Sequence, residues 1–428
     1  MRRDSWVLAG LAAVELGALW GALAYARRRR GDEVQIVAVE TALTERYKLN
    51  GPITNPTEQR DWDNRIHDAS EGRNSVYFDR WGNPSVLVKL GAKTLKEFDS
   101  SWPDRLHPAF IVNNVLKPTI YVAKFLGVRV TTPTGYGVIS LRGVDPQADV
   151  TFDAALSACR GSGLSLCTNA IYAYLALLCR KRGFMPRGNT SYGKSSDNPS
   201  EAGVVSYTYE SGGVIYAGRT LTGSGPSSWF HDGTQFGVAD LCGNVWEWAA
   251  GLRLIDGEIN VLPDNDAAGA NADLSRTSAA WKAILQDGSL VAPGTAGTLK
   301  YDSPNPMTND GVTQNQGAPI LRTSILNGPD PTWGWGDGYY DYNYGIFENI
   351  TADSGVTVPA ILRQLCIFPP GVGLGSDGCW VRNYGERVAF RGGDWDSGAS
   401  AGVFALYLNA PRSSSHHSIG FRAAFIPA

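Results

Sequence analysis

The sequence has few charged residues and no excess of one charge, and these shortages exclude several classes of protein. Only 18 % of its 428 residues are charged, and the net charge is −3. No overall charge therefore attracts the chain to nucleic acid. A disordered chain would carry more charge and fewer aromatic residues than the 11 % present.

Cysteine is also scarce. The six cysteines form no CxxC pair, which argues against a zinc ribbon or a thioredoxin-like site. They are too few for a disulfide scaffold, so we expect buried, reduced thiols.

Glycine and tryptophan are abundant, with 50 and 13 residues. This composition is typical of a loop-rich globular protein, long enough to form two or three domains.

Residues 6–26 are almost entirely apolar. Glu15 is the only charged interruption, and four arginines, Arg27 to Arg30, follow. The length would span a membrane, and the basic flank lies on the wrong side for a cleaved signal peptide. A membrane anchor at 6–26 with the rest of the chain cytoplasmic, a soluble helix and a segment foreign to the ancestral protein all remain open for residues 1–30.

The following residues predict a small β-containing N-terminal region, 31–105. We expect a helix over 34–47 and a turn-rich linker over 50–60. Apolar, β-branched runs predict four strands, at 75–78, 85–90, 109–112 and 119–125. We place a domain boundary near residue 105, and the main domain over 106–428.

Two helices are expected between residues 150 and 183. Thr151 or Asp153 can cap the first, which would end at Gly161 or Gly163. Thr168 can cap the second, over 169–182, and Gly183 can end it. Apolar residues surround this second helix, so we expect it to be largely buried.

The string over 188–195 (GNTSYGKS) fits the phosphate-binding pattern GxxxxGK[ST]. That pattern binds phosphate when a strand precedes the glycines and a helix follows. Here a helix is expected before it, and the next residues (SDNPS) do not form one. We interpret the string as a structural loop.

Trp246 and Trp248 fall on one face of an expected strand and should anchor the core. Glu247 between them could be an acid catalyst or a buried carboxylate bonded to backbone amides.

Residues 262–345 are loop-like, with one Trp/Tyr/Gly-rich stretch over 333–344 that could recognise a ligand or pack on the core. Its accessory candidates are Trp333, Trp335, Tyr339 and Tyr340.

Near the C-terminus, small polar residues interleave with an apolar strand. Alternation over 403–408 places Phe404, Leu406 and Leu408 on the core face and turns Tyr407 outward.

Five strings resemble, in order, the formylglycine-generating-enzyme (sulfatase-modifying factor) superfamily. They are residues 164–176, 186–189, 243–248, 391–395 (RGGDW) and 420–422 (GFR). The resemblance implies an α+β, loop-rich fold of the C-type-lectin type over about 106–428. Within that superfamily, residues 391–425 resemble the variable region of target proteins of diversity-generating retroelements, which occur in bacteria and prophages.

In such targets, an error-prone reverse transcriptase changes adenines, so asparagine codons of the template can become any NNY codon. The resemblance assigns twelve candidate positions, each of a residue type that an NNY codon encodes: Asp394, Asp396, Ser397, Ala399, Tyr407, Ala410, Ser413, Ser414, Ser415, His416, His417 and Ser418. A hypervariable surface of this kind must be exposed and clustered. We interpret it as a non-enzymatic ligand-binding site of the receptor-binding or adhesion type.

The main alternative is an oxidase of the same superfamily, or a degenerate relative. Those enzymes use paired cysteines near the C-terminus to bind copper, yet no cysteine lies between Arg391 and Ala428. His416 and His417 would point to opposite faces of a strand and could not chelate together. We therefore expect no catalysis, cofactor or metal.

The expected partner is an unknown protein or glycan, on a cell surface in one interpretation, and not nucleic acid. The protein would be placed on a phage virion, a cell surface or a membrane. A third reading is a phage structural protein whose C-terminus does not vary.

Overall fold

The computed structural model describes residues 31–306, 314–328 and 342–427. These residues form a mixed α and β structure with few helices and many loops. The predicted anchor at residues 6–26 and the aromatic candidates Trp333, Trp335, Tyr339 and Tyr340 lie outside them. In the described part of the chain, no helix is both long and apolar enough to cross a membrane.

The helices follow local capping signals. A first helix covers residues 31–50 and contains the predicted 34–47. The others are α2 (Pro56–Ala69), α3 (Phe152–Gly161), α4 (Asn169–Arg182) and α5 (Ala360–Gln364). The hydroxyls of Thr151 and Thr168 cap α3 and α4, and Gly183 ends α4 in the left-handed region at φ 65°, as predicted.

One helix was not predicted. α2 begins inside the stretch that the sequence indicated as a linker, and it covers residues 56–60 of that stretch. The Asn55 side chain accepts hydrogen bonds from the backbone N–H groups of Thr57 and Glu58, and Pro56 stands at the first helical position. An Asn-Pro pair therefore begins a helix here, because proline is favoured where no backbone donor is needed.

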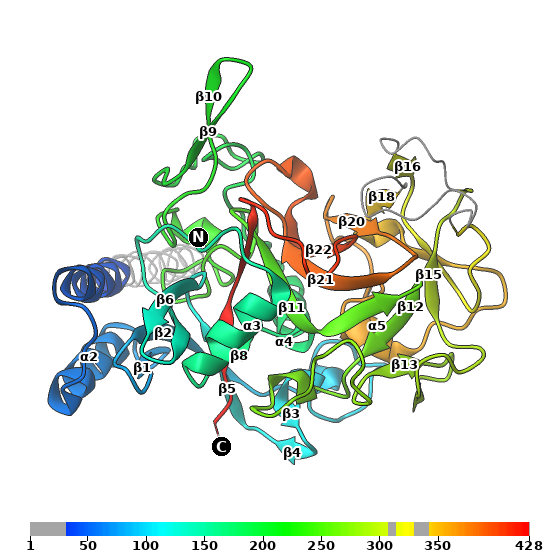
Figure 1. Cartoon of the computed structure of the whole chain (residues 1–428), viewed down its shortest axis with the longest axis horizontal. Helices are drawn as coiled ribbons and strands as arrows, with labels where there is room; N and C mark the ends of the chain where they lie inside the picture. The colour runs from blue at the N-terminus through cyan, green and yellow to red at the C-terminus, as the bar shows by residue number, and fades with distance from the viewer. Residues whose placement is uncertain (1–30, 307–313, 329–341, 428) are drawn as a thin grey trace, which may run out of the picture.

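A five-stranded sheet joins distant parts of the chain, in the order β1-β2-β5-β24-β8. Its strands are β1 (Asn74–Phe78), β2 (Pro84–Gly91), β5 (Thr119–Ala123), β24 (Ala423–Phe425) and β8 (Ser165–Leu166). Because β2 pairs with β5, strand pairing continues across the boundary expected near residue 105. Figure 1 shows the C-terminus beside β5.

The larger sheet positions the candidate surface. Its central order is β20-β22-β21-β11-β12. These strands are β20 (Gly378–Val381), β22 (Gly402–Leu408), β21 (Glu386–Gly392), β11 (Trp246–Ile255) and β12 (Glu258–Val261), and β23 (Ile419–Phe421) pairs in parallel with β11. The sheet is completed by β13 (Lys282–Ile284), β14 (Leu290–Val291), β15 (Lys300–Asp302), β16 (Gln314–Gln316), β17 (Ile320–Arg322), β18 (Tyr342–Ile346) and β19 (Thr351–Ala352).

Three hairpins lie outside the two sheets. They are β3 (Ile111–Val112) with β4 (Val115–Leu116), β6 (Val128–Thr132) with β7 (Gly135–Ile139), and β9 (Thr208–Ser211) with β10 (Val214–Ala217). Only the end of the strand predicted at 109–112 is extended, since residues 108–110 form a 3-10 turn. The β9–β10 hairpin projects from the body of the molecule (Figure 1).

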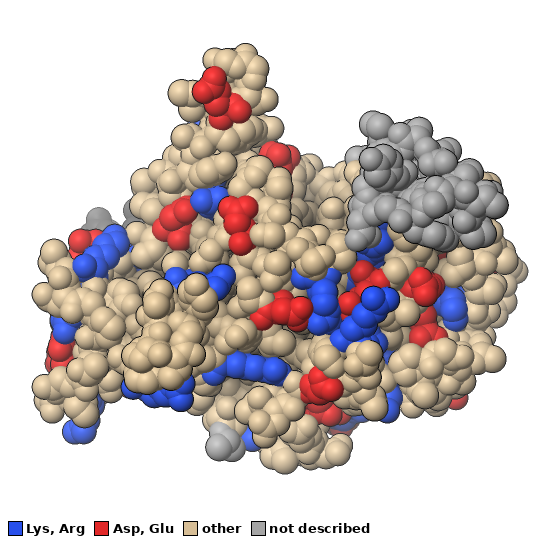
Figure 2. Space-filling view, viewed as in Figure 1, with Lys and Arg blue, Asp and Glu red and all other residues tan. Residues whose placement is uncertain are grey.

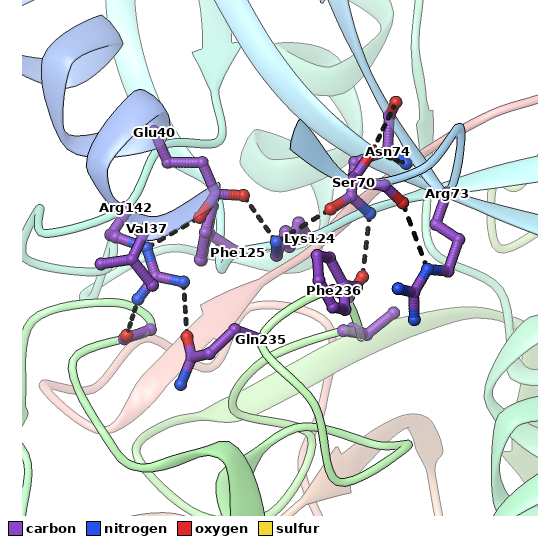
Figure 3. Close-up of polar contacts among 12 residues, drawn as sticks. Val37, Glu40, Ser70, Arg73, Asn74, Lys124, Phe125, Arg142, Gln235 and Phe236 are labelled. Atoms are coloured by element: carbon purple, nitrogen blue, oxygen red, sulfur yellow. Dashed lines mark hydrogen bonds and ion pairs between the residues drawn. The ribbon is translucent and has the colours of Figure 1, made fainter. Parts of the chain in front are cut away.

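A buried ion cluster fixes the first helix to the rest of the fold (Figure 3). Glu40 is completely buried, and its carboxylate accepts hydrogen bonds from Lys124 at 2.5 Å and Arg142 at 2.8 Å. Lys124 also donates to Asn74 at 3.0 Å, and Arg142 to Gln235 at 2.7 Å. Each buried charge is thus paired and hydrogen-bonded, as burial requires.

Candidate functional site

The scaffold beneath the candidate surface is built from the strings that carried the family resemblance. Glu247 on β11 lies in register with Arg391 on β21 and with Gly420 on β23. Its carboxylate binds the Arg422 guanidinium through two hydrogen bonds, at 2.8 and 2.9 Å. Arg391 donates to the side chain of Asn169 at the start of α4.

Of the two predictions for Glu247, the buried carboxylate is confirmed. The predicted bonds to backbone amides are wrong, because the partner is a side chain. Glu247 pairs with a buried arginine, which also donates to the carbonyls of Ala123, Lys124 and Ala239. A two-pronged guanidinium–carboxylate pair of this kind fixes geometry as well as charge. The pair joins β11 to the residue between β23 and β24, so it ties the C-terminal strands to β11 under the surface.

The core face of β22 is as predicted. Phe404, Leu406 and Leu408 are completely buried, and Trp246 and Trp248 on β11 are 6 % and 0 % exposed. The opposite face is covered too, because Val403 and Ala405 are also buried. β22 lies between β20 and β21.

Nine of the twelve candidate positions reach solvent. Asp396, Ala399, Ser413, Ser415 and His416 are exposed, and Ser397, Tyr407, Ser414 and His417 are half-buried. They belong mainly to the loop between β21 and β22 and to the loop between β22 and β23. Loops carried on a rigid sheet can change sequence with little effect on the core.

Three positions contradict the expected exposure. Asp394, Ala410 and Ser418 are 7 %, 7 % and 5 % exposed. The carbonyl of Ala410 accepts a hydrogen bond from the N–H of Val388, and the carbonyl of Ser418 accepts one from Trp246. These two residues therefore belong to the scaffold.

Six of the positions come together in one cluster: Asp394, Asp396, Ser397, His416, His417 and Ser418. The Ser397 hydroxyl donates to Asp394 at 2.5 Å, and the His416 ring lies 3.0 Å from the Ser418 hydroxyl. Burial, and after it the charge of Asp396, raise the pKa of Asp394 to about 7. A carboxyl group here changes charge near neutral pH.

The two histidines do not point apart as expected. His416 and His417 lie in the loop before β23, not in a strand, and their ring centroids are 3.7 Å apart. The His417 ring also stacks on Trp395 at 5.3 Å. Burial, and next the neighbouring His416, lower the pKa of His417, so both effects favour a neutral imidazole.

Tyr407 forms a second, aromatic part of the surface. Its ring lies 5.2 Å from Trp246, 5.4 Å from Phe390 and 5.7 Å from Trp380. It is half-buried rather than turned fully outward, and burial raises the pKa of its phenol to about 12. Within the described part of the chain, no hydrogen bond joins Ala399, Ser413, Ser414 or Ser415 to the other candidate positions.

The β9–β10 hairpin adds residues that the sequence did not single out. Tyr209 stacks on Tyr216 at 5.5 Å, and its ring lies 6.2 Å from His417. Val214 and Ile215 at the hairpin tip are 51 % and 73 % exposed. Figure 2 shows an acidic group on this hairpin, whose one acidic residue is Glu210. In the sequence, the apolar run Val214-Ile215-Tyr216 was the signal that could have pointed to this hairpin.

The phosphate-loop pattern is a structural loop, as predicted. No strand leads into residues 188–195 and no helix follows them. The Asn189 side chain accepts a hydrogen bond from the N–H of Gly193 and donates to the carbonyl of Gly218. A Cβ atom on Gly188 would lie 1.7 Å from the carbonyl oxygen of Cys242, so glycine is required there by packing.

All six cysteines are buried and free. Burial raises the pKa of Cys366 and of Cys379 to about 12, so both remain thiols at neutral pH. Across residues 31–306, 314–328 and 342–427, no group of three or more histidine, cysteine, aspartate or glutamate side chains is placed to hold a metal ion.

Neither a known protein family nor a curated protein sequence matches the chain. Similar solved structures include three variants of a protein named Major Tropism Determinant. The I1 variant is 13 % identical with a TM-score of 0.27, over 72 % of this chain and 50 % of its own. The M1 and U1 variants are 11 % and 12 % identical, each with a TM-score of 0.27 over 82 % of this chain and 71 % of their own. The chain thus spans half the length of the I1 variant.

Proposed function

We propose that the chain is a non-enzymatic receptor-binding protein of the adhesion type. Its fold would be of the C-type-lectin type, and its C-terminal surface would be diversified by a retroelement. The observation that carries the proposal is the separation of roles along residues 394–418. Nine candidate positions reach solvent, while Phe404, Leu406 and Leu408 between them are completely buried.

This separation is what a mutable binding surface requires. Substitutions at exposed sites usually change stability by about 0.5 kcal/mol or less, whereas core substitutions cost several times more. The proposed binding surface consists of the nine accessible positions together with the tip of the β9–β10 hairpin. Tyr407, Tyr209 and Tyr216 supply aromatic contact area, which dominates binding hot spots.

The state of the cysteines supports a non-enzymatic role. Copper binding and oxygen activation need accessible thiolates, because the thiolate is the metal ligand. Cys366 and Cys379 are completely buried, and burial raises their pKa values. The partner in this proposal is a protein or glycan on a cell surface.

Two experiments test the proposal. The DNA beside the gene should hold a near-identical copy of codons 391–425 that differs at adenines, next to a reverse-transcriptase gene. In addition, a display library randomised at the nine accessible positions should yield folded binders to an arbitrary immobilised protein. A matched library at nine exposed positions of the helix over 31–50 and of α2 is the control. Absence of the template copy, or equal yields from both libraries, would reject the proposal.

A further inference from the structure

A pocket on another part of the molecule has the chemistry of an anion site. It lies between α4, the end of β2 and the loop over 231–236, and its volume is about 280 Å³. None of its lining residues belongs to the candidate surface. The volume is near the lower end of the range for small-molecule sites, so it suits a ligand the size of one sugar ring.

Four residues with cationic side chains line this pocket, and they come from three parts of the fold. Lys89 comes from β2, Arg182 from the last turn of α4, and Arg73 and Lys93 from the segments before β1 and after β2. The only carboxylate in the lining, that of Asp232, accepts hydrogen bonds from the N–H and hydroxyl of Thr234. The lining therefore carries four positive charges and one negative charge.

The cations differ in how they are engaged. Arg73 pairs with Glu71 at 3.2 Å, donates to the carbonyl of Ser70 and lies over the Phe236 ring at 3.7 Å, so its guanidinium is held in place. Lys93 pairs with Glu97 at 2.9 Å, and because such an exposed pair contributes little, this cation can turn to a ligand. Lys89 and Arg182 have no carboxylate partner among the residues that the structure describes.

The inner wall adds a neutral donor and an apolar surface. His231 is 3 % exposed, and its Nδ1 accepts a hydrogen bond from the N–H of Val238 at 2.8 Å. This bond places the ring proton on Nε2, which is then a donor. Burial lowers the pKa of His231 to about 4, so the ring stays neutral. Tyr174 and Leu178, one helical turn apart on α4, supply the apolar part of the wall.

We propose that this pocket binds a phosphate or sulfate ester of a sugar-sized molecule. A tetrahedral oxyanion presents several acceptor oxygens in different directions, which matches cations that arrive from three separate elements. The ring of the ligand would lie against Tyr174 and Leu178. The site is independent of the receptor-binding proposal, so either can fail alone.

Isothermal titration calorimetry on the full chain tests the site. Glucose 6-phosphate, glucose 6-sulfate and glucose are titrated at one fixed ionic strength. We expect saturable one-site binding of at least one ester and none of glucose. Binding of the phosphate ester alone or of the sulfate ester alone identifies which oxyanion the pocket takes.

Three variants locate the binding. Arg182→Gln and Lys89→Gln should each weaken it about tenfold, the effect of losing one charge-assisted hydrogen bond. Both side chains are exposed, so both variants should fold, as a thermal melt would verify. Lys194→Gln is the matched control, because Lys194 is exposed, lies outside the pocket and belongs to the phosphate-loop-like string. No saturable heat with either ester, or equal weakening by the control, overturns the proposal.

Discussion

The same chemical change at two alanines separates scaffold from variable surface. Ala399 and Ala410 are both candidate positions, but Ala399 is exposed and Ala410 is 7 % exposed. Replacing each by asparagine, the residue expected in a retroelement template, adds an identical amide. Any difference in stability between the two variants therefore reports how the surroundings of the two alanines differ.

The magnitudes follow from these environments. At Ala399 the amide remains in water, so the free energy of unfolding should change by about 0.5 kcal/mol or less. At Ala410 the amide enters the apolar cluster that contains Val388 and Phe390. An unpaired buried amide costs about 1–3 kcal/mol, and overpacking adds about 1–3 kcal/mol. We expect Ala410→Asn to lose about 2–6 kcal/mol of stability.

Urea denaturation measures both variants against the parent. Ala399→Asn should leave the transition midpoint in place, and Ala410→Asn should lower it with an unchanged slope. A third variant combines asparagine at the eight accessible loop positions, which are all the accessible positions except Tyr407. It should lose less stability than Ala410→Asn alone. The reasoning is refuted if Ala410→Asn is neutral, or if the eight-position variant unfolds.

Four further predictions concern the rest of the molecule. Glu40→Gln leaves Lys124 and Arg142 without their buried counter-charge, so urea unfolding should show a loss of about 3–5 kcal/mol. Trp248→Ala removes a completely buried ring and should cost about 3–5 kcal/mol in the same assay. Asp394 has a pKa of about 7 in the fold and about 3.9 when unfolded, so folding takes up a proton between these values. The contribution of Asp394 to stability should therefore fall as pH rises from about 4 to about 7, by at most about 1.4 kcal/mol per unit, and between pH 5 and pH 8 urea titrations should show a smaller loss of stability for Asp394→Asn than for the parent. Equilibrium dialysis should detect no ATP binding that depends on Lys194, and binding that Lys194→Ala abolished would contradict the structural-loop assignment.

Local signals predicted the parts of the fold that depend on neighbouring residues. Thr151, Thr168 and Gly183 specify the ends of α3 and α4 through their own hydrogen bonds and φ angle. The start of α2 escaped prediction because Asn-Pro favours both a turn and a helix N-terminus. In this case tertiary packing of Trp62 and Ile66 selected the helix.

The candidate surface was harder to predict, because its burial depends on residues far along the chain. Ala410 is covered through its bond to Val388, and Ser418 through its bond to Trp246, which is 172 residues away in sequence. Alternation could place Phe404 and Leu406 in the core, but it carried no information on these pairings. The anion pocket shows the same limit, since Lys89, Arg182 and His231 meet only in the fold.

The position of β24 has a consequence for biosynthesis. This strand lies between β5 and β8, so the five-stranded sheet stays open until residues 423–425 leave the ribosome. Arg422, which neutralises the buried Glu247, arrives at the same late moment. A stop codon or frameshift anywhere in 394–418 deletes both. Truncated products would retain an unpaired buried carboxylate and an open sheet edge, which favour aggregation and degradation. We therefore expect a chain that stops before residue 422 to fold incompletely.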